Sequence, residues 1–272
     1  MPDPGRSIDK THLSIDQAEE RGFLHRDYLA HCLRWSHVAK HLGKQQAYKT
    51  AKILDIGCGK ETPLIKTLYT MRMTPEIYVG VDYNKPVVQA IHDKIYDKMG
   101  SGNFDLAWNF DASKENAFRD LDFTPTVITC FEVLEHITPR KVSGMLNNIR
   151  GIADKNTTIF ISTPVFNGKA AANHINEMTY ETMQSLLEIT GFKIVKNFGT
   201  FASQKDIEPI LYETGKSDLT AAYEYLKDYY DSNVLSCLFA PLLPRYSRNV
   251  LWVCQIDPIY ISLKERRKHV ET

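Results

Sequence analysis

Two glutamates and a histidine follow an apolar run in the middle of the chain. The run TVITCFE covers residues 126–132 and leads into CFEVLEHI, which places Glu132, Glu135 and His136 close together. A short helix beginning after the run would put these side chains on one face, at positions i, i+3 and i+4. Two carboxylates and an imidazole form a mixed ligand set suited to Mg²⁺ or Mn²⁺. The same groups could act as acid and base without a metal.

A second histidine is a candidate fourth ligand. His174 lies in HINEMT, between an apolar run at 157–163 and a helical pattern at 179–190. The carboxyl ends of parallel strands meet at one edge of a sheet, so we expect His174 to approach the first three side chains there. The sequence therefore predicts four catalytic residues and metal ligands: Glu132, Glu135, His136 and His174.

Short apolar runs and helical patterns alternate along the chain and would position these side chains. Runs that read as continuous apolar strands between helices indicate a parallel sheet covered on both faces. We therefore expect an α/β fold with a doubly wound, seven-stranded, mostly parallel sheet. The expected strands are 52–57, 77–82, 104–111, 126–132, 157–163, 193–199 and 249–256, and the expected helices are 14–43, 62–73, 85–98, 139–153 and 179–190.

The chain divides by pattern into four segments. Residues 1–48 are predicted as an N-terminal helical cap and 49–202 as the cofactor-binding core. Residues 203–248 are too long for a plain connection between strands, so they are predicted as an inserted lid or substrate segment. The last strand and a C-terminal tail occupy 249–272.

Glycines and acids follow the first three runs, where a doubly wound sheet binds its ligand. In LDIGCGKET, Gly57 and Gly59 permit a tight turn and Asp55 places an acceptor beside it. An acid ending the second strand, here Asp82, can accept hydrogen bonds from ribose hydroxyls. Thr62 stands where a dinucleotide motif would have its third glycine. The predicted cofactor-binding residues are Asp55, Gly57, Gly59, Asp82, Asp111, Ala112 and Phe131.

These stretches together resemble a known family. LDIGCG, VGVDYN, FDAS and VITCFEVLEHI are similar to the first four cofactor motifs of class I S-adenosylmethionine-dependent methyltransferases, over roughly residues 50–200 plus the last run. The resemblance implies a Rossmann-like methyltransferase fold with a reversed last strand and S-adenosylmethionine as cofactor. It also implies that Gly57 and Gly59 line the methionine part, Asp82 binds the ribose and Asp111 contacts adenine.

Two motifs resemble narrower groups. CFEVLEHI and HINEMT are similar to the motifs with which small-RNA 3′-terminal 2′-O-methyltransferases hold a divalent metal against ribose hydroxyls. The first is also similar to a stretch of the ubiquinone-pathway O-methyltransferases, which act on a catechol. Both acceptors are vicinal diols, so the resemblance implies O-methylation of a hydroxyl or diol. Two alternatives stay open: metal-free methylation of a small molecule or nucleic acid with His136 as base, and a cofactor-binding regulator without chemistry.

Composition limits the partners. Lys and Arg number 33 and Asp and Glu number 33, so the net charge gives no indication of nucleic acid or anionic membrane. A nucleic-acid substrate would need a local patch, for which LKERRKH at 263–269 is the basic candidate, although such a stretch is typical of a solvated tail. The expected substrate is a small molecule or an RNA terminus. Five single cysteines and a polar N-terminus predict a soluble, cytoplasmic protein.

One N-terminal feature could serve the cofactor. Arg26 or Arg34 of the predicted helix could pair with the methionine carboxylate, or could belong to the solvated face of that helix. The tyrosines of YEYLKDYY, at 223–230, could likewise stack on a flat substrate or pack in a core.

Overall fold

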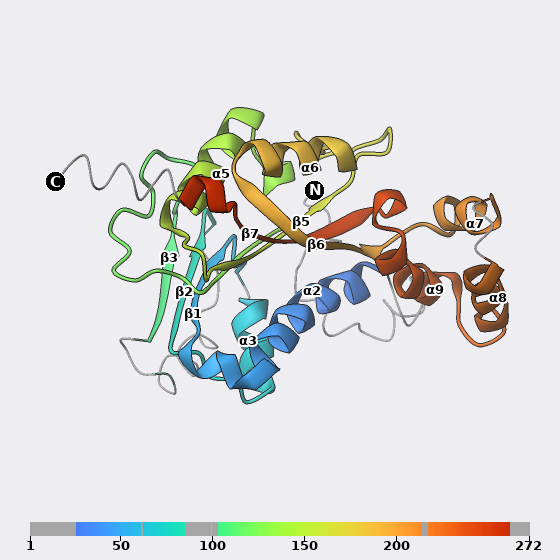
Figure 1. The fold of residues 1–272 in the computed structure, drawn as a ribbon, viewed down its shortest axis with the longest axis horizontal. Helices are drawn as coiled ribbons and strands as arrows, with labels where there is room; N and C mark the ends of the chain where they lie inside the picture. Colours follow the sequence, from blue (N-terminus) through green and yellow to red (C-terminus); the bar gives the residue numbers. More distant parts are fainter. Residues whose placement is uncertain (1–25, 61, 85–98, 100–102, 214–216, 262–272) are drawn as a thin grey trace.

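The computed structural model describes residues 26–60, 62–84, 99, 103–213 and 217–261. Within them, seven strands form one sheet with the order β3-β2-β1-β4-β5-β7-β6 (Figure 1). Strand β7 is antiparallel to both of its neighbours, β5 and β6, and the remaining pairs are parallel. The predicted doubly wound sheet with a reversed last strand is therefore confirmed. The strands are β1 (Lys52–Ile56), β2 (Ile77–Asp82), β3 (Phe104–Trp108), β4 (Val127–Phe131), β5 (Thr158–Pro164), β6 (Phe192–Phe201) and β7 (Asn249–Ile256).

Helices cover both faces of the sheet (Figure 1). Helices α2 (Arg26–Gly43) and α3 (Pro63–Thr70) lie on one face, and α5 (Pro139–Ile152) and α6 (Tyr180–Ile189) lie on the other. Each face has its own apolar core, because the central strands are buried on both sides. The predicted helix at 85–98 and the part of the N-terminal helix before residue 26 lie outside the described residues.

The interval before the last strand folds as a helical arm. It contains α7 (Gln204–Glu213), α8 (Ser217–Leu226) and α9 (Ser232–Phe239), and two short 3-10 turns, η4 (Ala240–Leu242) and η5 (Pro244–Tyr246), lead into β7. Its core contains Tyr223, so this tyrosine packs inside the arm, whereas Tyr225 and Tyr229 are exposed. Helix α8 is the arm element furthest from the sheet, and α9 contacts α2 (Figure 1). A lid function for this arm stays a prediction.

The described helices do not resemble membrane spans. None of them combines the length and the apolar content that crossing a bilayer requires.

Candidate active site at the carboxyl edge of the sheet

The glycine loop after β1 is folded tightly over the end of β2. Gly57 and Gly59 have φ angles of 71° and 72°, which favour glycine. A Cβ on Gly57 would lie 2.2 Å from a Val133 methyl carbon, so only glycine permits this approach. The backbone N–H of Gly59 donates to Asp82 Oδ2 at 2.9 Å. Asp82, the predicted ribose acid, therefore also fixes the loop.

Asp55 lies beneath this loop and not at the surface. Tyr78 Oη and Thr129 Oγ1 each donate to one of its carboxylate oxygens at 2.6 Å. The side chain is buried, and burial raises the pKa of Asp55 to about 6 although the two hydrogen bonds oppose the shift. Asp55 joins β1 to both of its neighbouring strands, and its predicted contact with the cofactor stays a prediction.

The third strand delivers Asp111 to the same edge. Its carboxylate accepts a hydrogen bond from the Ser113 backbone N–H at 3.1 Å and pairs with Lys141 Nζ at 2.9 Å. Hydrogen bonds from Ser113 and then Lys141 lower the pKa of Asp111 to about 2. Ala112 is buried and its carbonyl accepts from Asn148, and Phe131 ends β4 half-buried. The predicted cofactor residues thus gather at the ends of four adjacent strands.

Glu132 is held by donors from three other elements. Its carboxylate accepts from Ser162 Oγ at 2.8 Å and from Asn249 Nδ2 at 2.9 Å to each oxygen. Arg34 of α2 places a guanidinium nitrogen 3.4 Å from the same carboxylate and donates to Asn249 Oδ1 at 3.0 Å. We call Glu132, Ser162, Asn249 and Arg34 the Glu132 anchor.

The anchor keeps Glu132 ionised. Burial alone would raise the pKa of Glu132, but the Arg34 charge and the hydrogen bonds from Asn249 and Ser162 outweigh burial and lower it. Arg34 is only 2% exposed and is committed to this ion pair, which is a different partner from the methionine carboxylate considered above. The N-terminal helix is therefore joined to the end of β4 by a charge pair whose arginine is buried and whose glutamate is 26% exposed.

The turn after β4 differs from the helix expected from the spacing. Only a single 3-10 turn, η3 (Leu134–His136), forms. Glu132 precedes it with a φ of 56°, a left-handed conformation that is uncommon outside glycine. Glu132 is therefore not on a helical face shared with Glu135 and His136, and the left-handed residue directs its carboxylate to the anchor instead.

The structure brings together the other three predicted ligands. Glu135, His136 and His174 each offer one ligand atom, and these atoms all lie within 4.8 Å of one another. The two imidazole centroids are 4.8 Å apart at an interplanar angle of 80°. We call these three residues the ligand cluster.

Glu135 fits a site for a cation. Its side chain is 1% exposed, and its Oε2 atom has no hydrogen-bond partner among the described residues. Burial and the nearby Glu132 charge raise the pKa of Glu135 well above its ordinary value. A buried carboxylate oxygen without a donor is costly, and a bound cation would compensate it. His136 Nε2 lies 3.6 Å from the other oxygen.

The loop between β5 and α6 orients both histidines. His174 Nδ1 is hydrogen-bonded to Glu177, whose carboxylate also accepts from the Ala171 backbone N–H at 3.1 Å. His136 Nδ1 lies 3.2 Å from the Asn173 carbonyl oxygen. Carboxylate and carbonyl partners of this kind fix the tautomer of a metal-binding imidazole. Both histidines are therefore preorganised by the same loop.

The same loop is fastened to η3 and to α6. The backbone N–H groups of Ile175 and Asn176 donate to the Glu135 carbonyl at 2.9 and 3.1 Å. Thr179 caps α6 by accepting from the Thr182 backbone N–H. The sequence pointed to Glu177 only through the HINEMT motif, and nothing in it indicated Asn249 or Ser162 as partners of Glu132.

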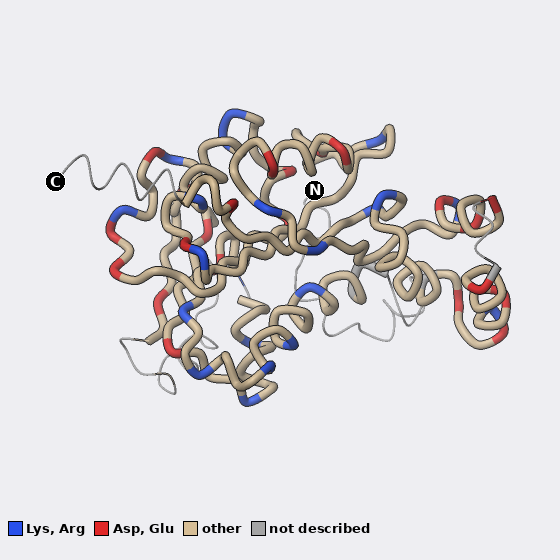
Figure 2. Tube along the Cα trace, viewed as in Figure 1, with Lys and Arg blue, Asp and Glu red and all other residues tan. Residues whose placement is uncertain are grey.

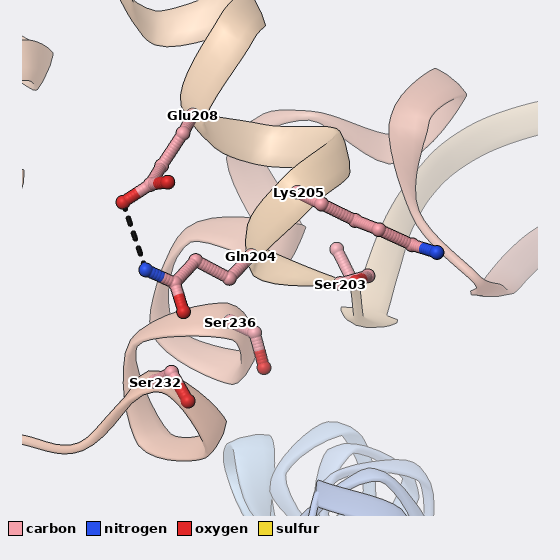
Figure 3. A pocket seen from close by; sticks show the side chains of 7 residues that line it. Ser203, Gln204, Lys205, Glu208, Ser232 and Ser236 are labelled. Atoms are coloured by element: carbon pink, nitrogen blue, oxygen red, sulfur yellow. Dashed lines mark hydrogen bonds between the residues drawn. The ribbon is translucent and has the colours of Figure 1, made fainter.

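A separate polar cavity lies at the base of the arm. Its volume is about 330 Å³, and it shares no lining residue with the ligand cluster. Figure 3 shows Gln204 and Glu208 of α7 hydrogen-bonded across one side of it. The lining residues are Ala202, Ser203, Gln204, Lys205, Glu208, Ser232 and Ser236.

Comparison with known proteins identifies the family. Residues 27–197 match the model of a methyltransferase domain family, and no curated protein matches the chain. Among solved structures, magnesium protoporphyrin IX methyltransferase from Synechocystis PCC 6803 with bound S-adenosylhomocysteine superposes with a TM-score of 0.52 at 13% identity, covering 90% of this chain and 89% of that one.

Two further structures share the fold. The methyltransferase domain of bacterial CtHen1-C has a TM-score of 0.52 at 15% identity, with 84% of this chain and 99% of that chain covered. The Burkholderia thailandensis 1,6-didemethyltoxoflavin-N1-methyltransferase, with S-adenosylhomocysteine bound, has a TM-score of 0.50 at 14% identity, with 82% and 76% covered. Since the family model matches more than half of the chain and the fold agrees, the chain belongs to the methyltransferase domain family.

Proposed function

We propose that the protein transfers the methyl group of S-adenosylmethionine to an oxygen of a vicinal diol, assisted by a divalent cation on the ligand cluster. One observation carries the proposal: Glu135, His136 and His174 converge within 4.8 Å at the edge of the sheet where the glycine loop lies. The neighbours in the structural comparison act on unlike acceptors, so the diol is argued from the cluster and from the two sequence motifs.

The donor set favours Mn²⁺ over Mg²⁺. Carboxylate oxygen suits both ions, but two imidazoles favour a transition metal. The buried, unpartnered Glu135 oxygen and the Glu177-bound His174 are the features expected of a ligand and its supporting residue. When bound, such a cation acts as a Lewis acid and lowers the pKa of a hydroxyl. Glu132 would support the site through its fixed negative charge.

The reaction is an in-line displacement. An acceptor oxygen forms a bond to the methyl carbon as the carbon–sulfur bond breaks, and S-adenosylhomocysteine leaves. The proton of the acceptor hydroxyl must be removed. With a cation on the ligand cluster, the lowered pKa of the hydroxyl would let this proton leave to solvent. Without a cation, His136 is placed to take the proton, because it is 39% exposed and the Asn173 carbonyl fixes its ring. The same geometry supports the second candidate, metal-free methylation with His136 as the only base.

A methyl-transfer assay with defined acceptors tests this proposal. Labelled S-adenosylmethionine would be supplied with an RNA oligonucleotide ending in a free ribose diol, with the same oligonucleotide ending in a 3′-deoxyribose, and with catechol. Transfer to a diol acceptor that stops with chelator and returns with Mn²⁺ supports the proposal. Transfer that persists with chelator and in His174→Ala favours the metal-free reaction, and labelling of the 3′-deoxy oligonucleotide as fast as the diol excludes a diol requirement.

A further inference from the structure

The ligand cluster offers a cation fewer protein ligands than the sequence predicted. Glu132, the remaining predicted ligand, is turned to its own anchor, which leaves Glu135, His136 and His174. Mg²⁺ and Mn²⁺ prefer octahedral coordination, so three protein ligands leave several positions open. A further oxygen atom beside the cluster would supply a fourth protein ligand.

Asn173 carries an oxygen of this kind. It directly precedes His174 in the loop between β5 and α6. Its Oδ1 atom is buried and has no hydrogen-bond partner among the described residues. Four buried side-chain atoms in the described part of the chain share this property: Thr62 Oγ1, Glu135 Oε2, Asn173 Oδ1 and Trp252 Nε1. Two of the three oxygens therefore belong to the turn and the loop that form the ligand cluster.

Asn173 lies against His136. Its backbone carbonyl oxygen is 3.2 Å from His136 Nδ1, and its Nδ2 atom is 3.4 Å from the same nitrogen. An imidazole that binds a cation through Nε2 keeps its proton on Nδ1, where the Asn173 carbonyl accepts it. Nδ1 then has no lone pair that could accept from Nδ2. In the tautomer that binds a cation, His136 therefore does not hold the Asn173 amide, and Oδ1 is available as a ligand.

The charge around the cluster favours a cation. Residues 165–190 contain three glutamates and one lysine, and Figure 2 shows the red segments on α6. Burial and the charges of Glu132 and Glu177 raise the pKa of Glu135, and the Arg34 charge, which is already paired with Glu132, does not outweigh them. A positive group between the buried oxygens of Glu135 and Asn173 would compensate both.

The burial of these oxygens suits a metal ion better than a water molecule. A hard divalent cation contacts its oxygen ligands at about 2.0 to 2.6 Å, whereas a water hydrogen-bonds at about 2.7 Å and needs a cavity of its own size. Oxygens that are closed to solvent can therefore still share a metal ion.

We propose that Asn173 Oδ1 is a fourth ligand of the divalent cation, beside Glu135, His136 and His174. This inference rests on the proposed function. The set then contains two imidazole nitrogens, one carboxylate oxygen and one amide oxygen. Carbonyl oxygen is a hard donor that suits Mn²⁺, so Asn173 favours this ion over softer metals. The set carries a single negative charge, which leaves the divalent cation positive enough to polarise an acceptor hydroxyl.

A turned amide is the rival arrangement. Rotation of the Asn173 amide by 180° exchanges Oδ1 and Nδ2, so that Nδ2 would serve as a donor to Glu135. Asn173→Asp separates the two arrangements. A carboxylate strengthens a cation site, but it repels Glu135 where a donor is required.

The test is a calorimetric Mn²⁺ titration of the full chain saturated with S-adenosylhomocysteine. Wild type is compared with Asn173→Ala, Asn173→Asp and the matched control Asn176→Ala, which removes another amide of the same loop. Loss of a residue that only supports a ligand weakens metal binding about 10- to 100-fold, so Asn173→Ala should lose at least about ten-fold. Asn173→Asp should bind Mn²⁺ at least as tightly as wild type, and Asn176→Ala should follow wild type.

Thermal unfolding of the same variants gives a second readout that does not depend on activity. Asn173→Asp places a second carboxylate beside Glu135, so its thermal midpoint should fall below that of wild type in metal-free buffer. Saturating Mn²⁺ should raise the midpoint of Asn173→Asp more than that of Asn173→Ala, because tighter binding to the folded chain stabilises it more.

The outcomes separate this inference from the proposed function. Wild-type Mn²⁺ affinity in Asn173→Ala overturns the inference. Equal weakening in Asn173→Ala and Asn173→Asp also overturns it and makes Asn173 a hydrogen-bond donor. If the variants bind Mn²⁺ as expected but wild type methylates no diol, the proposed function fails and the ligand assignment stands. If chelator stops diol methylation but Asn173→Ala binds Mn²⁺ as wild type does, the ligand assignment fails and the proposed function stands.

Discussion

The Glu132 anchor and the ligand cluster begin three residues apart and treat their acids in opposite ways. Glu132 receives hydrogen bonds from Ser162 and Asn249 and a charge pair from Arg34, and its pKa is lowered. Glu135 is at least as buried, yet one of its oxygens has no donor among the described residues, and its pKa is raised. In the Glu132 anchor, both carboxylate oxygens already have hydrogen-bond donors. The Glu135 arrangement leaves one carboxylate oxygen that can be satisfied by a proton or by a bound cation.

A third acid, Asp55, shows which kind of partner lowers the pKa of a buried carboxylate. Asp55 receives two hydroxyl donors but no cation, and its pKa is still raised to about 6. Hydrogen-bond donors alone therefore do not hold the pKa of a buried carboxylate at its ordinary value in this protein. The Arg34 guanidinium makes the difference at Glu132, and we expect a bound cation to do the same at Glu135.

The largest expected effect comes from the ligand cluster. Glu135→Gln should lower kcat for methyl transfer about 100- to 10,000-fold, because an amide neither neutralises a cation nor accepts a proton. The free energy of unfolding should hardly fall, since the amide relieves a buried acid. Steady-state kinetics and urea unfolding measure the two effects. Activity within three-fold of wild type would show that Glu135 is not a ligand.

Breaking the anchor should cost stability. Arg34→Met leaves the Glu132 charge without its cation, and because the Glu132 side chain is 26% exposed we expect the free energy of unfolding to fall by about 3 kcal/mol, the lower end for a buried pair. Arg34→Met/Glu132→Gln should recover part of that loss. Arg248→Met breaks the pair with Asp206, in which the arginine is 24% exposed against 2% for Arg34; it is the matched control and should cost about 1 kcal/mol or less. Equal losses from the two arginine variants would refute a special role for the pair of the buried Arg34 with Glu132.

The pH dependence of stability sharpens the contrast with Asp55. Its pKa is about 6 in the folded protein against an ordinary value of 3.8, so between pH 4 and 6 the folded chain holds a proton that the unfolded chain has released. The free energy of unfolding should therefore decrease as pH rises through this window, by up to about 3 kcal/mol from this group. Asp55→Asn should lack this component. If the free energies of unfolding of wild type and Asp55→Asn follow parallel curves from pH 4 to 7, Asp55 is not the source of this pH dependence.

The smallest expected effect concerns the support of His174. Glu177→Gln should weaken Mn²⁺ binding about 10- to 100-fold by loosening the imidazole, with a smaller change in kcat at saturating metal. Glu181→Gln, on the surface of α6, is the matched control. Calorimetric titrations measure the Mn²⁺ affinities of the two variants and of wild type. If excess Mn²⁺ does not restore the methyl-transfer activity of Glu177→Gln, Glu177 does more than orient His174.

Local patterns predicted the elements well. The runs 77–82 and 249–256 are strands with those same bounds, and the run ending at Glu132 gives β4 within one residue. A buried strand reads directly as a continuous apolar run. His174 could also be predicted, because its loop follows a strand that ends at the same edge as β4.

The partners of Glu132 could not be predicted in this way. Asn249 is 117 residues away, and its contact depends on β7 entering the sheet in reverse beside β5. The helical spacing i, i+3, i+4 was misleading because Glu132 adopts a left-handed conformation. The predicted basic tail at 263–269 lies outside the described residues.

Mn²⁺ binding to the full chain with S-adenosylhomocysteine, followed by electron paramagnetic resonance, tests the central claim most directly. We predict one bound Mn²⁺ per wild-type chain, lost in His174→Ala and in Glu135→Gln but retained in the surface control Glu181→Gln. Wild-type protein that leaves Mn²⁺ free in solution, or His174→Ala that binds it as tightly as wild type does, would contradict a metal site at the ligand cluster.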